Sequence, residues 1–276
     1  MMLQQTPLSS RLRNRYGPAA VVTGASSGIG EQFARELAAE RFDLLLVARR
    51  SELLFQLAEE LRAQHGISVH VLAADLADPA SADAVVSGAE EMDVGLLVCS
   101  AGFGTSGAFI EGNLADECAM VDVNCRSLIT LTWHFGKRFA DRRRGGIVLM
   151  SSLVGFQGVP WAAHYAATKA YVQCLAEGLH HELKPFGVDV LASAPGPVHS
   201  GFADRANMQM GMALRPQNVA KATLTALGRR STIRPGWLSK ALEWSLKPLP
   251  RWGRVRMMGV VMGGMTRSRA KADQRS

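Results

Sequence analysis

The fold is decided by the stretch Val21-Val22-Thr23-Gly24-Ala25-Ser26-Ser27-Gly28-Ile29-Gly30, near the start of a chain of 276 residues. The apolar run at 19–22 predicts a buried strand. After the glycines, residues 31–37 place their apolar side chains at helical spacing, which predicts a helix. A strand, a glycine-rich turn and a helix in this order are typical of α/β folds.

Three glycines in this stretch have separate uses. Gly24 lets the backbone turn tightly, Gly28 lets a diphosphate approach the main chain, and Gly30 lets the helix pack closely on the strand. The amides at the start of the helix would then face the anion, where the helix dipole favours negative charge. The spacing Gly-x-x-x-Gly-x-Gly differs by one residue from the common dinucleotide fingerprint. On this stretch alone, an ordinary strand-to-helix turn with no bound nucleotide is therefore an alternative interpretation.

The alternation of strand and helix continues along the chain. Continuous apolar runs predict further strands at 43–47, 69–73, 95–99, 146–150 and 188–192. Helices are predicted between them, the longest at about 114–140 and about 162–185. Strands that are apolar on both faces indicate a doubly wound parallel sheet of the Rossmann type, an α/β fold with helices on both faces.

We expect a single domain with two flanking segments. Residues 1–16 read as a polar, basic lead-in that is loosely ordered, residues 17–232 as the α/β domain, and residues 233–276 as a basic amphipathic C-terminal helical tail. The composition, 47% hydrophobic and 20% charged, excludes a disordered chain. No apolar run approaches the roughly 20 residues that span a bilayer, and the lead-in lacks the apolar core of a secretory signal.

The four cysteines stand without a Cys-x-x-Cys pair. Free thiols in a reducing compartment are therefore favoured over a disulfide or a zinc site. We expect a cytoplasmic protein with no bound metal.

Three residues form a candidate catalytic group. Tyr165 and Lys169 stand four residues apart in a predicted helix, so their side chains lie on one face. A nearby ammonium lowers the pKa of a tyrosine, which lets the phenol exchange a proton near neutral pH. Ser152 follows the strand at 146–150, at the edge where open parallel sheets bind ligands. Each feature has a plain structural alternative: a surface pair for Tyr165 and Lys169, and a helix or turn cap for Ser152.

Together the motifs resemble the short-chain dehydrogenase/reductase family over about residues 17–230. They occur in the family's order and spacing: Thr23-Gly24-x-x-x-Gly28-Ile29-Gly30, Asp75-Leu76, Ser100-Ala101-Gly102, Asn124, Ser152, Tyr165-x-x-x-Lys169 and Pro195-Gly196-Pro197-Val198. The stretches 47–50 and 101–105 look most like the bacterial branch described as DltE-like.

The resemblance implies a catalytic tetrad. Tyr165 would be the acid/base, and Lys169 would hold the nicotinamide ribose and lower the pKa of the tyrosine. Ser152 would orient the substrate carbonyl. Asn124 would hold a water that connects Lys169 to solvent, or would simply satisfy neighbouring backbone. The resemblance also implies a set of cofactor-binding residues: Gly24, Ser26, Ser27, Gly28, Ile29, Gly30, Arg49, Arg50, Asp75, Leu76, Ser100, Ala101, Gly102, Tyr165, Lys169, Pro195, Gly196, Val198 and Ser200.

One departure from the family pattern concerns the end of the fourth predicted strand. The family usually has Asn-Asn-Ala-Gly there, whereas this chain has Cys99-Ser100-Ala101-Gly102. Ser100 can make some of the hydrogen bonds of the missing amides and Cys99 almost none. The substitution bears on cofactor affinity and leaves the catalytic group unchanged.

The end of the second predicted strand distinguishes the two nicotinamide dinucleotides. An acidic residue there binds the ribose 2′-hydroxyl and repels a 2′-phosphate. This chain has the neutral Ala48, followed by Arg49 and Arg50, and a guanidinium matches phosphate geometry. The sequence therefore favours NADP(H) over NAD(H), although two arginines could also simply begin a solvated helix.

The expected function is NADP-dependent hydride transfer between a nicotinamide and a carbonyl or secondary alcohol. In the family a loop after Pro195-Gly196 covers the substrate, here at about 197–215. The sequence places soft apolar side chains in this loop, at Phe202, Met208, Met210 and Met212, so a lipophilic substrate is expected, although Met can also be packing filler. The alternative is a non-catalytic dinucleotide-binding scaffold or redox sensor. Such proteins usually lose the tyrosine or the lysine.

The charge of +7 is concentrated at the C-terminus. From Arg229 onward twelve Lys or Arg face two acids, a net charge of +10, which leaves −3 for residues 1–228. Basic residues among tryptophans and a stripe of Leu238, Leu242 and Leu246 fit an interfacial helix on anionic lipid. A helix that covers the protein's own core or a partner subunit fits equally well. Nucleic acid is disfavoured because no recognised motif supports it.

The expected partners are a small carbonyl or alcohol substrate and further copies of the chain. In the family, the two long helices commonly form a four-helix contact between subunits, so a homodimer or homotetramer is expected. Peripheral contact with an anionic membrane is the further expectation from the tail.

Overall fold

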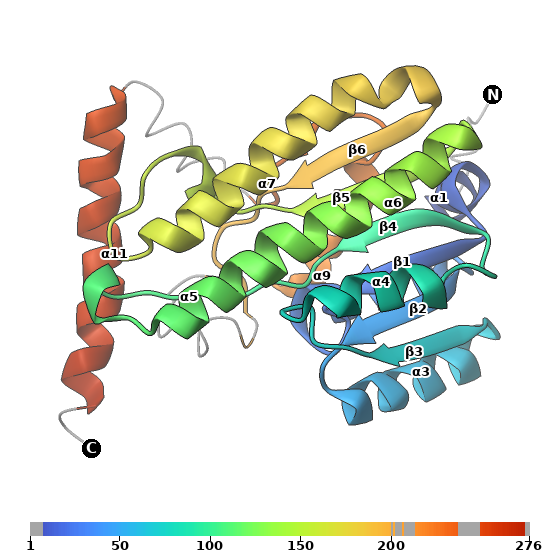
Figure 1. Ribbon diagram of the computed structural model, residues 1–276, viewed down its shortest axis with the longest axis horizontal. Helices are drawn as coiled ribbons and strands as arrows, with labels where there is room; N and C mark the ends of the chain where they lie inside the picture. The colour runs from blue at the N-terminus through green and yellow to red at the C-terminus, as the bar shows by residue number, and fades with distance from the viewer. Residues whose placement is uncertain (1–7, 200, 202–205, 207–212, 237–248, 274–276) are drawn as a thin grey trace, which may run out of the picture.

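A computed structural model describes residues 8–199, 201, 206, 213–236 and 249–273 (Figure 1). Its centre is a seven-stranded parallel sheet in the order β3-β2-β1-β4-β5-β6-β7. The predicted strands are present, and a short one is added at the edge of the sheet. The strands are β1 (Ala19–Thr23), β2 (Asp43–Ala48), β3 (Val69–Ala73), β4 (Val94–Cys99), β5 (Gly145–Met150), β6 (Val188–Ser193) and β7 (Thr232–Ile233).

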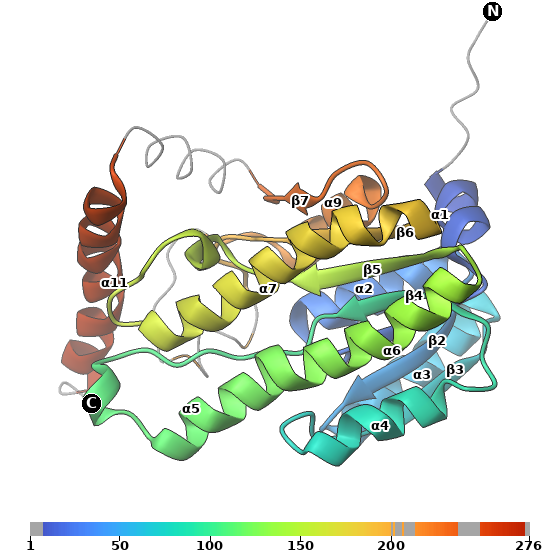
Figure 2. The same ribbon diagram turned by 45° about the horizontal axis from the view of Figure 1, so that its top comes forward.

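Helices cover both faces of this sheet, as Figures 1 and 2 show. One apolar layer joins the sheet to α1, α2, α3 and α9, and the other joins it to α4, α6 and α7. Because both faces are covered, every residue of β1, β4 and β5 is buried, which is why these strands are continuous apolar runs. The helices are α1 (Leu8–Tyr16), α2 (Gly28–Ala39), α3 (Ser51–His65), α4 (Pro79–Gly88), α5 (Leu114–Val121), α6 (Leu128–Asp141), α7 (Ala163–Glu182) and α9 (Pro216–Ala226). The predicted α/β fold class is confirmed.

The strand order reverses between β1 and β4. In open parallel sheets a crevice forms at such a reversal, beyond the carboxyl ends of the strands. The glycine-rich turn follows β1, Ser100 follows β4, and Ser151 and Ser152 follow β5. The sheet therefore brings three separate motifs of the sequence to one edge.

Two predictions about helices need correction. The lead-in is not loosely ordered over residues 8–16: this segment is α1, whose Leu12 and Tyr16 are buried in the core because they pack against the sheet. The predicted helix at about 114–140 is interrupted by a π-helical turn, Asp122–Ser127, between α5 and α6. The predicted helix at about 162–185 is α7, followed by a 3₁₀ turn at Lys184–Phe186.

The last helix, α11 (Arg251–Asp273), lies at the end of the molecule toward which the strands point (Figures 1 and 2). Its Met262 is buried against Val159, Ala162 and Ala166, with Met258 packed beside them. This part of the tail therefore covers the protein's own core. The predicted stripe at 238–246 lies outside the described residues. Among the helices that the structure describes, none is long and apolar enough to cross a membrane.

Candidate functional site

The glycine-rich turn has the geometry that its sequence predicts. Gly24 and Gly28 have positive φ angles of 69° and 60°, which glycine adopts without strain. A Cβ on Gly30 would lie 2.2 Å from the carbonyl oxygen of Gly24, so glycine is required where α2 meets the turn. Ser27 precedes α2, but its side chain does not cap the helix. The first amides of α2 are therefore open to an anion.

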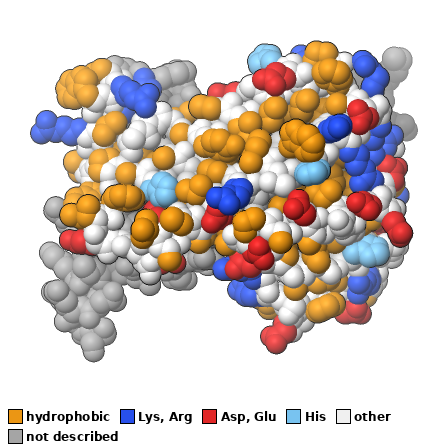
Figure 3. All heavy atoms as spheres, viewed as in Figure 1, with side chains coloured by type: hydrophobic (Ala, Val, Ile, Leu, Met, Phe, Trp, Pro, Cys, Tyr) orange, Lys and Arg blue, Asp and Glu red, His pale blue; other side chains and the backbone are white. Residues whose placement is uncertain are grey.

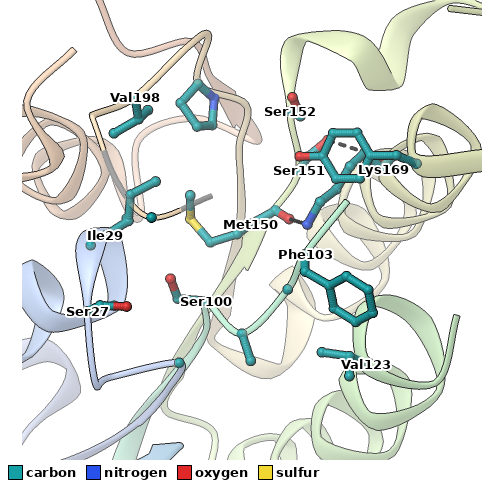
Figure 4. A pocket seen from close by; sticks show the side chains of 18 of the residues that line it. Ser27, Ile29, Ser100, Phe103, Val123, Met150, Ser151, Ser152, Lys169 and Val198 are labelled. Carbon is teal, nitrogen blue, oxygen red and sulfur yellow. Dashed lines mark hydrogen bonds between the residues drawn. The ribbon is translucent and has the colours of Figure 1, made fainter. Parts of the chain in front are cut away.

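The junction between β1 and β4 is braced by Thr23. Its hydroxyl accepts hydrogen bonds from the backbone amides of Ser100 (3.1 Å) and Ala101 (3.0 Å). The side chain of Ser100 points into the cavity in Figure 4. Cys99 is buried, and burial raises the pKa of its thiol to about 12. Thr23 therefore fixes the backbone that follows Cys99.

Two arginines stand at the end of β2, as the sequence predicts for NADP(H), but they differ in their contacts. A guanidinium nitrogen of Arg50 donates to the hydroxyl of Ser27 over 2.7 Å and also contacts Ser26, so Arg50 is tied to the glycine-rich turn. Arg49 is half-exposed, and its guanidinium lies 3.8 Å from the carboxylate of Asp75. Arg49 is therefore the freer of the two cations.

The candidate catalytic group comes together from two elements. Ser152 stands just after β5 in extended backbone, and Tyr165 lies in the first turn of α7. The hydroxyl of Ser152 is a hydrogen-bond partner of the buried Tyr165 phenol. Ser152 also receives a long bond of 3.5 Å from the amide of Val154, so its predicted cap role coexists with its contact to the tyrosine.

Lys169 is buried one turn further along α7. Its ammonium donates to the carbonyl oxygen of Met150 over 2.8 Å (Figure 4). The ammonium lies 5.8 Å from the centre of the Tyr165 ring. The hydroxyl of Ser151 donates to the backbone carbonyl of Lys169 over 3.0 Å, so Ser151 has a structural role. The surface pair offered as the alternative for Tyr165 and Lys169 is wrong because both side chains are buried.

Burial dominates the ionisation of this group. Burial raises the pKa of Tyr165 to about 12, and the hydrogen bond to Ser152 only partly opposes that shift. Burial lowers the pKa of Lys169 to about 8. Both shifts have one cause, since a site closed to water disfavours the charged form of each group. Burial therefore favours the protonated phenol of Tyr165, and the lowering of its pKa by Lys169 stays a prediction.

Asn124 lies in the π turn and is fully buried. Its amide oxygen accepts from the backbone amide of Phe103 (3.1 Å), and its amide nitrogen donates to the carbonyl of Phe103 (2.9 Å) and to the hydroxyl of Thr168 (3.0 Å). A Cβ on Gly102 would lie 2.9 Å from the Asn124 amide oxygen and 3.2 Å from the Lys169 ammonium. The observed contacts favour the alternative role, in which Asn124 fixes backbone. The water-mediated role stays a prediction.

One cavity of about 720 Å³ runs from the glycine-rich turn to Tyr165, and its lining also includes Arg49, Arg50, Ser152 and Lys169. The buried Asn124 is not among the lining residues. The cavity is also lined by residues that follow two other strands: Asp75 and Leu76 after β3, and Pro195, Gly196 and Val198 after β6. A parallel bridge between Val198 and Leu214 closes the base of the predicted substrate loop. Ser200, Phe202, Met208, Met210 and Met212 lie outside the described residues. Sequence reasoning missed the contribution of α11, whose Met258, Val261 and Met262 also line the cavity.

The residues present fit a nicotinamide dinucleotide. The open amides of α2 and the close approach at Gly30 suit a diphosphate, and the arginines after β2 suit the adenosine end. The far end of the cavity holds Ser152 and Tyr165 beside apolar side chains, which suits a nicotinamide ring and a second molecule. Such a cofactor supplies or accepts a hydride when bound.

The fold and the site together define a dinucleotide-binding oxidoreductase of the doubly wound class. The family model described as short chain dehydrogenase matches residues 18–211. The chain belongs to this family.

Similar proteins extend this relationship. The chain is 31% identical over 232 residues to a 7beta-hydroxysteroid dehydrogenase from Clostridium sardiniense, covering 83% of this chain and 89% of the relative. It is 30% identical over 261 residues to a very-long-chain 3-oxoacyl-CoA reductase from Podospora anserina, covering 88% of this chain and 76% of the relative. A solved short-chain dehydrogenase from Sphingobium yanoikuyae in complex with NADPH superposes with a TM-score of 0.77 at 32% identity, covering 84% of this chain and 92% of that one.

Proposed function

We propose that this protein is an NADP-dependent short-chain dehydrogenase/reductase that interconverts a lipophilic carbonyl compound and its secondary alcohol. The observation that carries the proposal is the hydrogen-bonded pair of Ser152 and Tyr165 in the same cavity as the glycine-rich turn. A proton donor and a second hydroxyl stand where a substrate oxygen would meet the nicotinamide end of the cofactor.

The residues have distinct tasks in this proposal. The Tyr165 phenol is protonated at neutral pH, so in the reductive direction it donates its proton to the carbonyl oxygen as charge develops there. Ser152 donates a second hydrogen bond to the same oxygen and orients it. Lys169 is proposed to hold the cofactor ribose and, while protonated, to stabilise the resulting phenolate. The buried surroundings exclude water from these groups.

NADP(H) is favoured by charge at the end of β2. The position that would be acidic in an NAD-binding site is Ala48, and Arg49 and Arg50 both line the cavity. Arg49 is the proposed ligand of the 2′-phosphate, because Arg50 is already tied to Ser27. The similarity to an NADPH complex supports this choice.

The cavity walls support a bulky lipophilic substrate. Beyond Tyr165 the lining is formed by Phe103, Val154, Met258, Val261 and Met262. Soft apolar walls of this kind bind hydrophobic surface without dictating one shape. The names of the relatives point to two candidates, a hydroxysteroid and a long-chain 3-oxoacyl thioester.

NADPH consumption against a set of carbonyl compounds tests the proposal. The set contains steroid ketones, long-chain 3-oxoacyl thioesters and small aldehydes, each with NADPH and with NADH. We expect turnover with at least one lipophilic ketone, a preference for NADPH, and loss of turnover in Tyr165→Phe. NADPH binding without turnover on every compound would instead favour the scaffold or redox sensor.

Three finer expectations belong to this proposal. The chain is expected to form a homodimer or homotetramer through α6 and α7, and to act in the cytoplasm with a peripheral membrane contact through its basic tail. Assignment to the DltE-like branch stays a prediction, since the relatives described above carry other names.

A further inference from the structure

Several large apolar side chains are exposed at one end of the molecule. They come from three separate segments: the turn at 109–114, the loop at 158–161, and α11. Within the described residues these side chains are Phe109, Ile110, Leu114, Trp161, Trp252, Met257, Val260 and Val261. Ile110 is 92% exposed and Val260 is 75% exposed. We call this set the apolar rim.

The three segments are neighbours in space. The amide of Gly107, two residues before the first segment, donates to the carbonyl of Trp161 over 2.8 Å, which holds the first segment near the second. A Cβ on Gly259 would lie 3.2 Å from Pro160, and one on Gly263 would lie 3.3 Å from Trp161, so α11 packs directly on the second segment. Figures 1 and 2 show the turn near residue 110 beside α11. The rim is therefore one surface.

This surface adjoins the opening of the candidate active site. Val261 both lines the large cavity and is 40% exposed, so it stands at the opening. A neighbouring cavity of about 490 Å³ is lined by Phe109 and Trp161, and it shares Asp116 and Ala162 with the first. An exposed apolar patch around a cavity mouth marks a contact surface.

The charged side chains around the apolar rim indicate which kind of partner it would bind. Arg251, Arg254 and Arg256 stand on the first turns of α11, and no acidic residue follows them before Asp273. On the neighbouring turn and the start of α5 the acidic side chains are Glu111, Asp116 and Glu117, of which Glu117 is buried and pairs with His164. Figure 3 shows basic groups among the hydrophobic ones at this end. A partner surface that carries negative charge would complement these arginines, and a second copy of the chain is an outcome of the test below.

We infer that the apolar rim docks on an anionic lipid surface, with the cavity mouth facing the membrane. Exposed Trp and aliphatic side chains enter the boundary between headgroups and acyl chains, and flanking arginines meet the lipid phosphates. The inference extends the proposed peripheral contact of the tail to residues 109–114, far away in the sequence. It does not depend on the proposed reaction, because lipid binding requires neither cofactor nor turnover.

Vesicle co-sedimentation of the full chain tests the inference, without NADPH or substrate. Vesicles of phosphatidylcholine alone are compared with vesicles that also contain phosphatidylglycerol. We expect binding to the anionic vesicles that declines as salt rises, since screening shortens the reach of the charges. Absence of binding to anionic vesicles, or equal binding to neutral ones at all salt concentrations, would overturn the inference.

Two pairs of substitutions distinguish vesicle binding by the apolar rim from vesicle binding by other surfaces of the protein. Ile110→Ser with Val260→Ser removes apolar side chains from two segments, and neither residue lines a cavity. We expect the partition coefficient on anionic vesicles to fall by roughly tenfold or more. The matched control is Leu53→Ser with Phe55→Ser, which removes exposed apolar side chains from α3 and should leave binding unchanged. Equal losses in both pairs, or no loss in the rim pair, would overturn the inference.

Two further measurements address charge and self-association. Arg251→Gln with Arg256→Gln should lower binding to anionic vesicles by roughly tenfold, since each charge near such a surface contributes to binding. Light scattering of the rim pair should show the oligomeric state of the unaltered protein. If the rim pair dissociates an oligomer while vesicle binding is unchanged, a second copy is the partner and the lipid inference is wrong.

Discussion

The ammonium of Lys169 donates a hydrogen bond to the carbonyl oxygen of Met150 over 2.8 Å. This bond ties α7 to the last residue of β5, directly before the serines that enter the cavity. Lys169 is thereby held in the floor of the site, with its ammonium bonded to backbone and 5.8 Å from the centre of the Tyr165 ring. The electrostatics of the site therefore follow from burial more than from the pairing of the two side chains.

Replacement of Tyr165 by Phe tests the proposed acid. The substitution removes the transferable proton and leaves the ring packed against Phe103 and Met120. We expect turnover to fall by about 10²–10⁴-fold while NADPH binding is retained. Steady-state kinetics and fluorescence titration of NADPH measure the two quantities. Near-normal turnover on every substrate would exclude Tyr165 as the acid.

The raised pKa of Tyr165 predicts its ionisation in the cofactor-free protein. With a pKa of about 12, the folded state keeps this proton where an unfolded tyrosine loses it near pH 10. The stability that this group contributes is complete below about pH 10 and is lost as pH rises toward 12. The difference in ultraviolet absorbance between wild type and Tyr165→Phe should show no phenolate below about pH 10. A phenolate near neutral pH would mean that Lys169 acts on Tyr165, as the sequence pattern predicts.

Arg49 and Arg50 are expected to behave differently toward the two cofactors. Arg49→Ala should raise the KM for NADPH by about tenfold and leave NADH largely unaffected, because only one cofactor has a 2′-phosphate. Arg50→Ala should weaken both, since Arg50 holds Ser26 and Ser27 of the glycine-rich turn. Kinetics with each cofactor check both variants. Equal losses with NADPH and NADH in Arg49→Ala would show that it is not a phosphate ligand.

Gly30→Ala should damage the cofactor site. A Cβ at 2.2 Å from the carbonyl oxygen of Gly24 forces the turn and α2 apart. We expect a loss of about 1–3 kcal/mol in the free energy of unfolding together with loss of NADPH binding. Gly88→Ala is the control, because its Cβ would meet only Leu72 and Leu45 at 3.8 and 3.9 Å. If both variants unfold alike, close packing at Gly30 is not the cause.

The exposed aromatic side chains of α6 and α7 mark the proposed subunit contact. Trp133 on α6 and Tyr171 on α7 are exposed, at 59% and 41%. Trp133→Glu with Tyr171→Glu should convert the oligomer to a monomer in light scattering. In a symmetric contact each substitution occurs in both subunits, so each one would bury two negative charges in the interface. Phe55→Glu on α3 should leave the oligomer intact. A wild-type protein that is monomeric at micromolar concentration would contradict the proposal.

Much of the site could be predicted because its motifs are local. The glycine-rich turn, Ser152 and the pair of Tyr165 and Lys169 each depend on spacing within one element, and the parallel sheet brings their elements to one edge. The hydrogen bonds of Asn124 could not be predicted in the same way, because its partners Phe103 and Thr168 lie on other parts of the chain. The role of Thr23 in bracing β4 was missed, although its place before Gly24 is part of the motif.

The sequence by itself determined the order of strands and helices, the turn at Gly24–Gly30 and the candidate acid, because backbone conformation and hydrophobic periodicity are properties of neighbouring residues. Only the tertiary structure decided the ionisation of Tyr165, the folding of residues 8–16 into α1, and the place of Met258 and Met262 in the cavity wall. Each of these depends on burial by segments far away in the chain. Burial determines both the free energy needed to ionise a side chain and the neighbours against which an apolar side chain packs. The pattern of neighbouring residues in the sequence does not predict either of them.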